Sequence, residues 1–111
     1  MLHPVAFSRD DSFPSWHHFV ITRALENHTY FLSLNRAGEF WGNSIFCPPW
    51  SGDHLSATTF GVDEEIRVFT VDRLILDEAR ATYPFSQDKL SDYSQLQVNG
   101  LPEGFEKAKV L

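Results

Sequence analysis

The chain has 111 residues, 42% of them hydrophobic and 22% charged, and its net charge of −6 comes from 15 acidic and 9 basic residues. A chain of this length most often forms one domain, and folding buries roughly two thirds of its surface, enough for a hydrophobic core. The basic residues are scattered, which argues against direct nucleic-acid binding, because phosphate contacts supply most of that affinity. A protein partner with a basic surface fits the charge better.

The cysteine content and the N-terminal sequence indicate a compartment. Cys47 is the single cysteine, so no internal disulfide can form, whereas small secreted domains usually carry an even set. The first residues lack the basic and apolar stretches of a secretory signal, and no apolar run approaches the roughly 20 residues that cross a bilayer. We therefore expect a single cytoplasmic domain over residues 1–111, without membrane association.

Three apolar runs follow a polar lead-in over residues 1–15, and they predict a sheet. The runs are HHFVITRAL, YFLSLN and FWGNSIF, separated by ENHT and RAGE. The first is rich in β-branched and aromatic residues, which is typical of a strand. Asn27 and His28 suit a two-residue loop, since both tolerate a positive φ. The pattern predicts a three-stranded antiparallel meander over about residues 17–46.

The second turn of this meander has its own signature, ending in Gly38. The sequence NRAG suits a type I turn followed by glycine in the left-handed region. This pairing would place Phe40 opposite Leu34 on the core face and Trp41 on the other, more mixed face. A helix, a loop or a partner must then cover Trp41. A second copy of the chain could do so, which makes a homodimer one alternative.

The second half of the chain combines a long connection with helical signals. Residues 47–64 form an irregular connection, and such long connections are often functional. Residues 66–71 are β-rich and predict a strand. Asp72 is a helix N-cap residue, which predicts a helix from Arg73 to about Thr82, although the strand pattern could instead continue through Leu76.

The last residues predict smaller elements, and together the elements define a fold class. We expect a short helix from Ser86 to about Gln95, a strand at 97–98 and a frayed tail at 105–111. The prediction is an α+β fold, with a small antiparallel sheet built on the meander and one or two helices packed on one face.

The residues that could act in catalysis or bind a metal ion do not have the sequence spacing that such sites require. Cys47 and His54 are seven residues apart, and His17 and His18 would point to opposite faces of a strand, so the pattern predicts no zinc site. Two prolines follow Cys47 and remove the N–H groups that often form an oxyanion hole. No hydrolase or phosphate-loop motif is present in the sequence. We therefore expect no catalytic, cofactor-binding or metal-ligating residue.

Aromatic and acidic residues then become the candidates, because tryptophan is enriched at binding hot spots and acids suit a basic partner. The candidate partner-binding residues are Trp41, Trp50, Asp53, Asp63, Glu64 and Glu65. They predict a non-catalytic protein-binding module, such as an inhibitor or adaptor that occupies a basic groove, for example a nucleic-acid-binding one, of another protein. In the opposing interpretation the tryptophans complete the core. The alternative function is a small enzyme or ligand-binding domain with a pocket under residues 47–64, lined by His17, Cys47 and His54.

Overall fold

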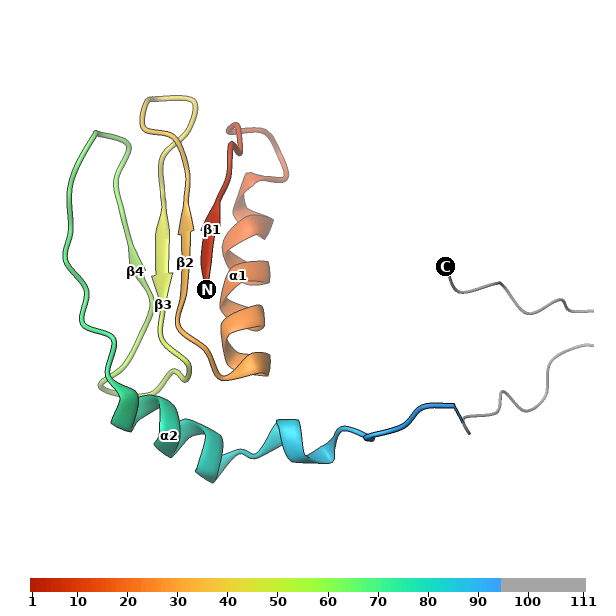
Figure 1. Ribbon diagram of the computed structural model, residues 1–111. Coiled ribbons are helices and arrows are strands. Elements are labelled where there is room, and N and C mark those ends of the chain that lie inside the picture. Colours follow the sequence, from red (N-terminus) through yellow and green to blue (C-terminus); the bar gives the residue numbers. More distant parts are fainter. Residues whose placement is uncertain (95–111) are drawn as a thin grey trace, which may run out of the picture.

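A four-stranded sheet with one long helix along one face forms the centre of the molecule (Figure 1). The computed structural model describes residues 1–94. The strands are β1 (Leu2–Pro4), β2 (Phe31–Leu34), β3 (Ile45–Cys47) and β4 (Thr58–Thr59), and the helices are α1 (Phe13–Asn27), α2 (Arg73–Thr82) and the 3₁₀-helix η1 (Phe85–Asp88). The spatial order is β1-β2-β3-β4, with β1 parallel to β2 and the other pairs antiparallel. The α+β prediction is confirmed, although the sheet is mixed rather than purely antiparallel.

The first strand of the predicted meander is wrong, because residues 13–27 form helix α1. The helix buries Phe13, Trp16, Val20 and Ala24, which recur at the three- and four-residue spacing of one helix face. Pro14 in the first turn favours the start of the helix. His28 does adopt the expected positive φ, of 43°, but as the left-handed C-cap of α1 rather than in a hairpin loop.

The core lies between α1 and one face of the sheet. Phe31 on β2 and Ile45 and Cys47 on β3 point toward the helix and are buried. Ser33, on the same face, is also buried, and its hydroxyl accepts a hydrogen bond from Trp16 Nε1 at 3.0 Å. A buried hydroxyl that is bonded in this way avoids the cost of an unsatisfied polar group. We call this side of the sheet the covered face.

The β2–β3 connection is longer than the predicted tight turn and takes a different path. Gly38 has a φ of 119°, but β3 begins only at Ile45, so Phe40 does not pair with Leu34 and is exposed. At Gly42, with a φ of 83°, an added Cβ would lie 2.8 Å from Val62 Cα. The loop therefore packs against the turn after β4, which short-range turn patterns do not indicate.

Helix α2 begins and ends where the sequence predicts. The Asp72 carboxylate accepts a hydrogen bond from the Leu74 N–H at 2.8 Å, as a helix N-cap residue does. Arg80, in the last turn, donates from Nε to the His28 carbonyl at 3.2 Å and links α2 to the end of α1. The helix expected from Ser86 is a single turn, η1, while the strand predicted at 97–98 and the tail at 105–111 lie outside the described residues.

Candidate interaction surfaces

The six predicted partner-binding residues separate into two groups at opposite ends of the sheet. Trp41 lies in the β2–β3 loop, which contacts the turn after β4 through a 2.6 Å hydrogen bond from the Gly38 N–H to the Val62 carbonyl. That turn continues into the acidic residues Asp63, Glu64 and Glu65. Trp50 and Asp53 follow β3 near the opposite end, beside α2. The predicted residues therefore do not form one surface.

Glu65 is occupied by contacts within the chain. Its carboxylate accepts from Arg67 Nε at 3.0 Å and from Arg67 Nη2 at 3.1 Å, and its Oε1 also accepts from the Gly61 N–H at 3.2 Å. The hydrogen bond with Arg67 lowers the pKa of the Glu65 carboxyl below its usual range. Among residues 1–94, Asp63 and Glu64 form no salt bridge, and both are exposed. These two carboxylates remain available to a partner.

Trp41 is half-buried and surrounded by basic groups. The guanidinium of Arg36 lies 4.8 Å from the centre of its ring, at the distance of a cation–π contact. Arg9 donates from Nε to the Trp41 carbonyl at 2.8 Å and from Nη2 to Asn43 Oδ1 at 2.8 Å. The acidic turn therefore lies beside arginines rather than in a purely negative field.

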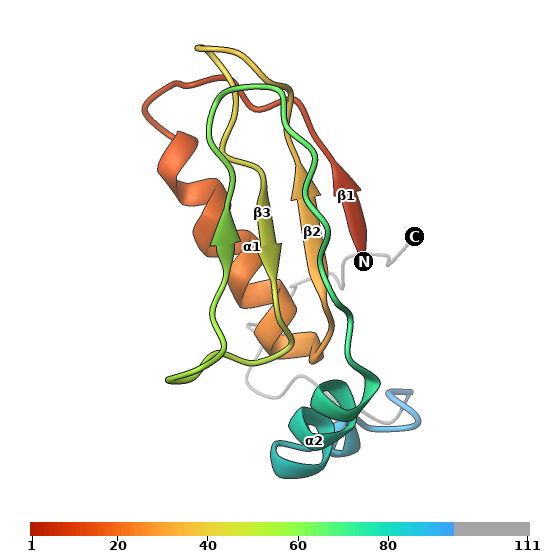
Figure 2. The same ribbon diagram turned by 90° about the vertical axis from the view of Figure 1, so that its left-hand side faces the viewer.

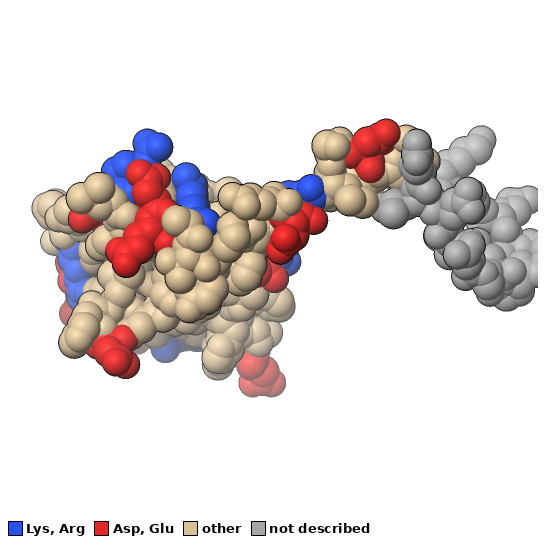
Figure 3. Space-filling model, turned by 90° about the horizontal axis from the view of Figure 1, so that it is seen from below, with Lys and Arg blue, Asp and Glu red and all other residues tan. Residues whose placement is uncertain are grey.

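Trp50 packs within the chain and joins α2 to the rest of the molecule. Its ring stacks on Tyr83 with 4.0 Å between the ring centres, and His28 lies 5.9 Å away. An open hollow of about 550 Å³ lies between this pair and α2, lined in part by His54 and Ile75. Seen from this end, acidic and basic side chains of the described residues lie close together in the upper part of the view, and separate acidic side chains lie at its lower edge (Figure 3).

The residues of the alternative pocket do not converge within the described part of the chain. Cys47 is buried in the core, and burial raises the pKa of its thiol to about 11, so the thiol is neutral at pH 7. His17 on α1 donates from Nε2 to the Asn43 carbonyl at 2.6 Å, and His54 is exposed beside Trp50. No described cavity is lined by more than one of the three. Among residues 1–94, no group of three His, Cys, Asp or Glu side chains could hold a metal ion.

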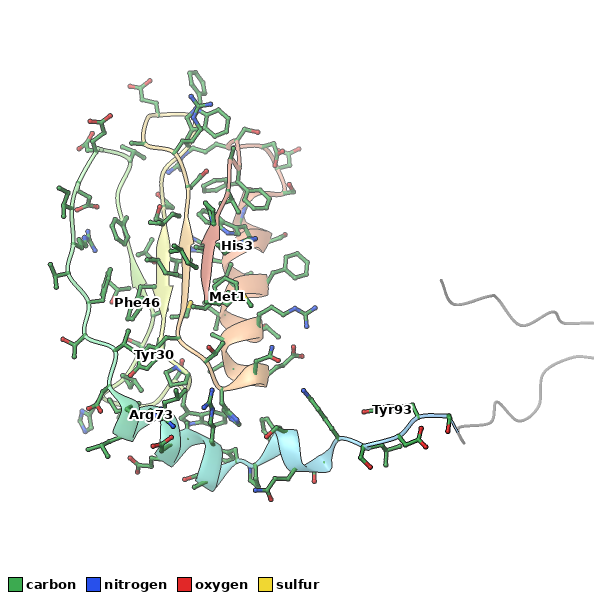
Figure 4. All side chains as sticks on the ribbon, viewed as in Figure 1. Met1, His3, Tyr30, Phe46, Arg73 and Tyr93 are labelled. Atoms are coloured by element: carbon green, nitrogen blue, oxygen red, sulfur yellow. The ribbon has the colours of Figure 1, made fainter. Side chains whose placement is uncertain are left out.

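The second face of the sheet is apolar, and α1 does not cover it. We call this side the open face, and its apolar hollow is lined by Met1, Leu2, Tyr30, Leu32, Phe46, Phe69 and Val71. The hollow measures about 390 Å³, and Leu2 and Val71 at its edge are 66% and 62% exposed. Tyr30 and Phe46 project from the sheet away from α1 (Figure 4). The sequence carries a signal for this face, because YFLSL places apolar residues on both sides of β2, as in strands buried on two faces.

The chain after β4 lies across part of the open face without joining the sheet. We call residues 63–71 the strap, and Figure 2 shows it crossing the sheet on the side opposite α1. Phe69 stacks on Phe46 with 4.2 Å between ring centres. Ile66 and Val68 face outward and are 97% and 93% exposed. The predicted strand over residues 66–71 is therefore wrong as a member of the sheet, because side-chain stacking rather than strand pairing holds this segment.

Comparisons with known proteins do not assign this surface. Neither the known protein families nor the curated proteins include a match to the chain. Within residues 1–94, no helix has both the length and the apolar character needed to cross a membrane. A function must therefore be inferred from the physical properties of the acidic turn and of the open face with its strap.

Proposed function

We propose that this protein is a binding module for another protein, that the open face and the strap form its contact surface, and that it performs no chemistry of its own. One observation carries the proposal, namely the exposed apolar side chains on this side of the molecule: Leu2 and Val71 line the hollow of the open face, and Ile66 and Val68 project outward from the strap beside it. Contiguous exposed apolar patches on folded proteins mark interaction sites, because leaving them in water is unfavourable.

The acidic turn supports a specific orientation for the partner. Asp63 and Glu64 are exposed and lie at the start of the strap, next to the apolar surface. Interfaces commonly place charges at a rim around an apolar centre, and rim charges contribute more to association rate than to affinity. A partner with a basic patch beside an apolar one fits this arrangement. The role of inhibitor or adaptor in a basic groove then depends on the apolar contact as well as on charge.

The test uses affinity capture with the full chain and with a double variant, Leu2→Asp with Val71→Asp. Both side chains are already largely exposed, so the variant should fold while placing charges on the open face. The expected result is that proteins captured by the unchanged chain are lost. Phe19→Asp is the matched control, because Phe19 is 67% exposed on the opposite side of the molecule, on α1.

Salt separates the apolar from the electrostatic contribution. Capture should persist at about 1 M salt, where the Debye length is only about 3 Å, because apolar contacts are not screened. Charge reversal at Asp63 and Glu64 should slow association and leave most of the captured protein bound. Capture that survives Leu2→Asp with Val71→Asp but is lost with Phe19→Asp would place the contact surface on α1 and refute the proposal.

A further inference from the structure

The strap alternates its side chains as a β-strand does, with Ile66 and Val68 outward and Arg67 and Phe69 inward, but among the described residues it pairs with no strand. Among the described residues, none of the N–H groups from Ile66 to Val71 donates a hydrogen bond, and none of the carbonyls in this range accepts one. Segments with unpaired backbone groups at an exposed edge are templates for pairing with another strand. Six residues of extended chain span about 20 Å, the length of an ordinary strand.

Contacts on the inner side of the strap hold it in place. Phe69 stacks on Phe46, and the Arg67 guanidinium lies 4.5 Å from the centre of the Phe60 ring. Arg67 Nη1 also donates to the Thr59 carbonyl at 3.2 Å. At the end of the strap, the Asp72 N–H donates to the Tyr30 hydroxyl at 3.2 Å. The strap is therefore positioned before any partner binds, which reduces the entropy lost on binding.

The hollow of the open face lies directly beside the strap. Phe69 and Val71 from the strap line it together with Leu2 on β1 and Leu32 on β2. A strand placed along the strap would direct every second side chain toward this hollow. Its other side chains would lie beside Ile66 and Val68, where β-branched and aromatic neighbours are favourable.

We propose that the partner binds by strand addition, laying an extended segment with apolar, β-branched side chains at alternate positions along Ile66–Val71. This inference rests on the proposed function and specifies its binding mode. The added strand pairs its backbone with that of the strap and buries Leu2 and Leu32 beneath it. The strap and the partner then form a second layer over the sheet, opposite the layer formed by α1.

The probe for this proposal is a synthetic cyclic β-hairpin peptide whose free edge alternates valine and threonine. The control is the same hairpin with N-methyl groups on that edge, which removes the hydrogen-bond donors and keeps the apolar side chains. We expect the unmethylated hairpin to bind the full chain at least about tenfold more tightly than the control, since several hydrogen bonds are lost together. Hydrogen exchange should show new protection at alternate amides of the strap, Val68 included, because successive N–H groups of a strand point to opposite edges.

A substitution in the strap tests the same backbone pairing by changing the protein instead of the hairpin. Val68→Pro removes one backbone N–H that donates no hydrogen bond within residues 1–94, and Val68→Thr keeps it with a side chain of similar shape. Val68→Pro should weaken hairpin binding about tenfold, with an unchanged circular dichroism spectrum, and Val68→Thr should leave the affinity unchanged.

The outcomes separate this inference from the proposed function. Equal binding of the two hairpins, or no binding of either, overturns strand addition, while the proposed function stands if Leu2→Asp with Val71→Asp still abolishes protein capture. A second copy of the chain is the other possible occupant. It would be shown by dimers in sedimentation and by hydrogen-exchange protection of residues 66–71 that rises with the concentration of the chain alone. This result would overturn the assignment to a different protein.

Discussion

Both faces of the sheet carry mostly apolar side chains, but their surroundings differ. On β2, Phe31 and Ser33 face α1 and are buried, while Leu32 and Leu34 face the other side and are only partly buried. The covered face is mostly closed by α1, and even its polar Ser33 finds hydrogen-bond partners in Trp16 and His3, although a hollow of about 290 Å³ remains beside Phe31. Within residues 1–94, the open face is crossed by the strap and keeps a hollow of about 390 Å³. Strands that are apolar on both sides need two covering layers, and the described residues supply one and part of another.

The largest expected effect on the free energy of unfolding comes from a substitution on the covered face, at Trp16. Trp16→Ala removes a buried indole and the hydrogen bond to Ser33, and should lower the free energy of unfolding by about 3–5 kcal/mol. Phe19→Ala, on the exposed side of the same helix, should change it by less than about 0.5 kcal/mol. Urea unfolding followed by circular dichroism measures both values. Similar losses for the two variants would mean that α1 does not pack through its Trp16 face.

The error over residues 13–27 shows what local patterns leave open. The run FVIT is β-rich, and strand propensity favoured a hairpin with Asn27 and His28 at its turn. Trp16, Val20 and Ala24 form a helical face, but this face is recognisable only once a sheet is available to cover it. Helix α2 was predicted correctly because its signals, Asp72 before it and Pro84 after it, are local.

The environment of the candidate partner-binding residues was harder to predict, because it depends on long-range packing. Trp50, a candidate contact residue, is half-buried and stacks on Tyr83 at the end of α2, a contact between distant parts of the sequence. Glu65 was another, yet its carboxylate is bound by Arg67 and by the Gly61 N–H. Ile66 and Val68 were expected to join the sheet, and their exposure follows from the crossing path of the strap, which short-range periodicity cannot specify.

A second prediction contrasts thiols on the two faces. Burial raises the Cys47 pKa to about 11 from an ordinary value of 9.0, so at pH 8 its thiolate fraction should be about a hundredfold below that of an exposed thiol. A thiol placed on the open face by Leu2→Cys, in a Cys47→Ala background, should react with iodoacetamide at the rate of a free cysteine. Comparable rates for the two thiols would contradict the assignment of Cys47 to the core.

The same pKa shift has a consequence for stability. Between pH 9 and about 11 the unfolded chain ionises Cys47 while the folded chain keeps it protonated, so the folded state binds more protons. The free energy of unfolding should therefore fall as the pH rises through this window and be unaffected by Cys47 below it. Cys47→Ala should remove this component of the slope in urea unfolding measured across the same range.

A third prediction concerns the strap, where a substitution should lower the free energy of unfolding by less than Trp16→Ala does and by more than a change at an exposed position. Phe69→Ala removes the ring that stacks on Phe46 and should lower the free energy of unfolding by about 1–2 kcal/mol, because Phe69 is only partly buried. Limited proteolysis should then cleave after Arg67, which the unchanged strap holds against Phe60 and Thr59. Val68→Ala is the control, since this outward-facing side chain should alter neither readout.

The smallest expected effect on stability is at the edge of the open face, where Leu2→Asp and Val71→Asp should each change the free energy of unfolding by less than about 0.5 kcal/mol. Both side chains are more than half exposed, so little buried area is lost in the free protein. The same pair should abolish partner capture, because each carboxylate would be desolvated in the complex. A large loss of stability would show that this edge is already packed in the free chain, and the contrast between a face covered by α1 and one covered only in part by the strap would no longer hold.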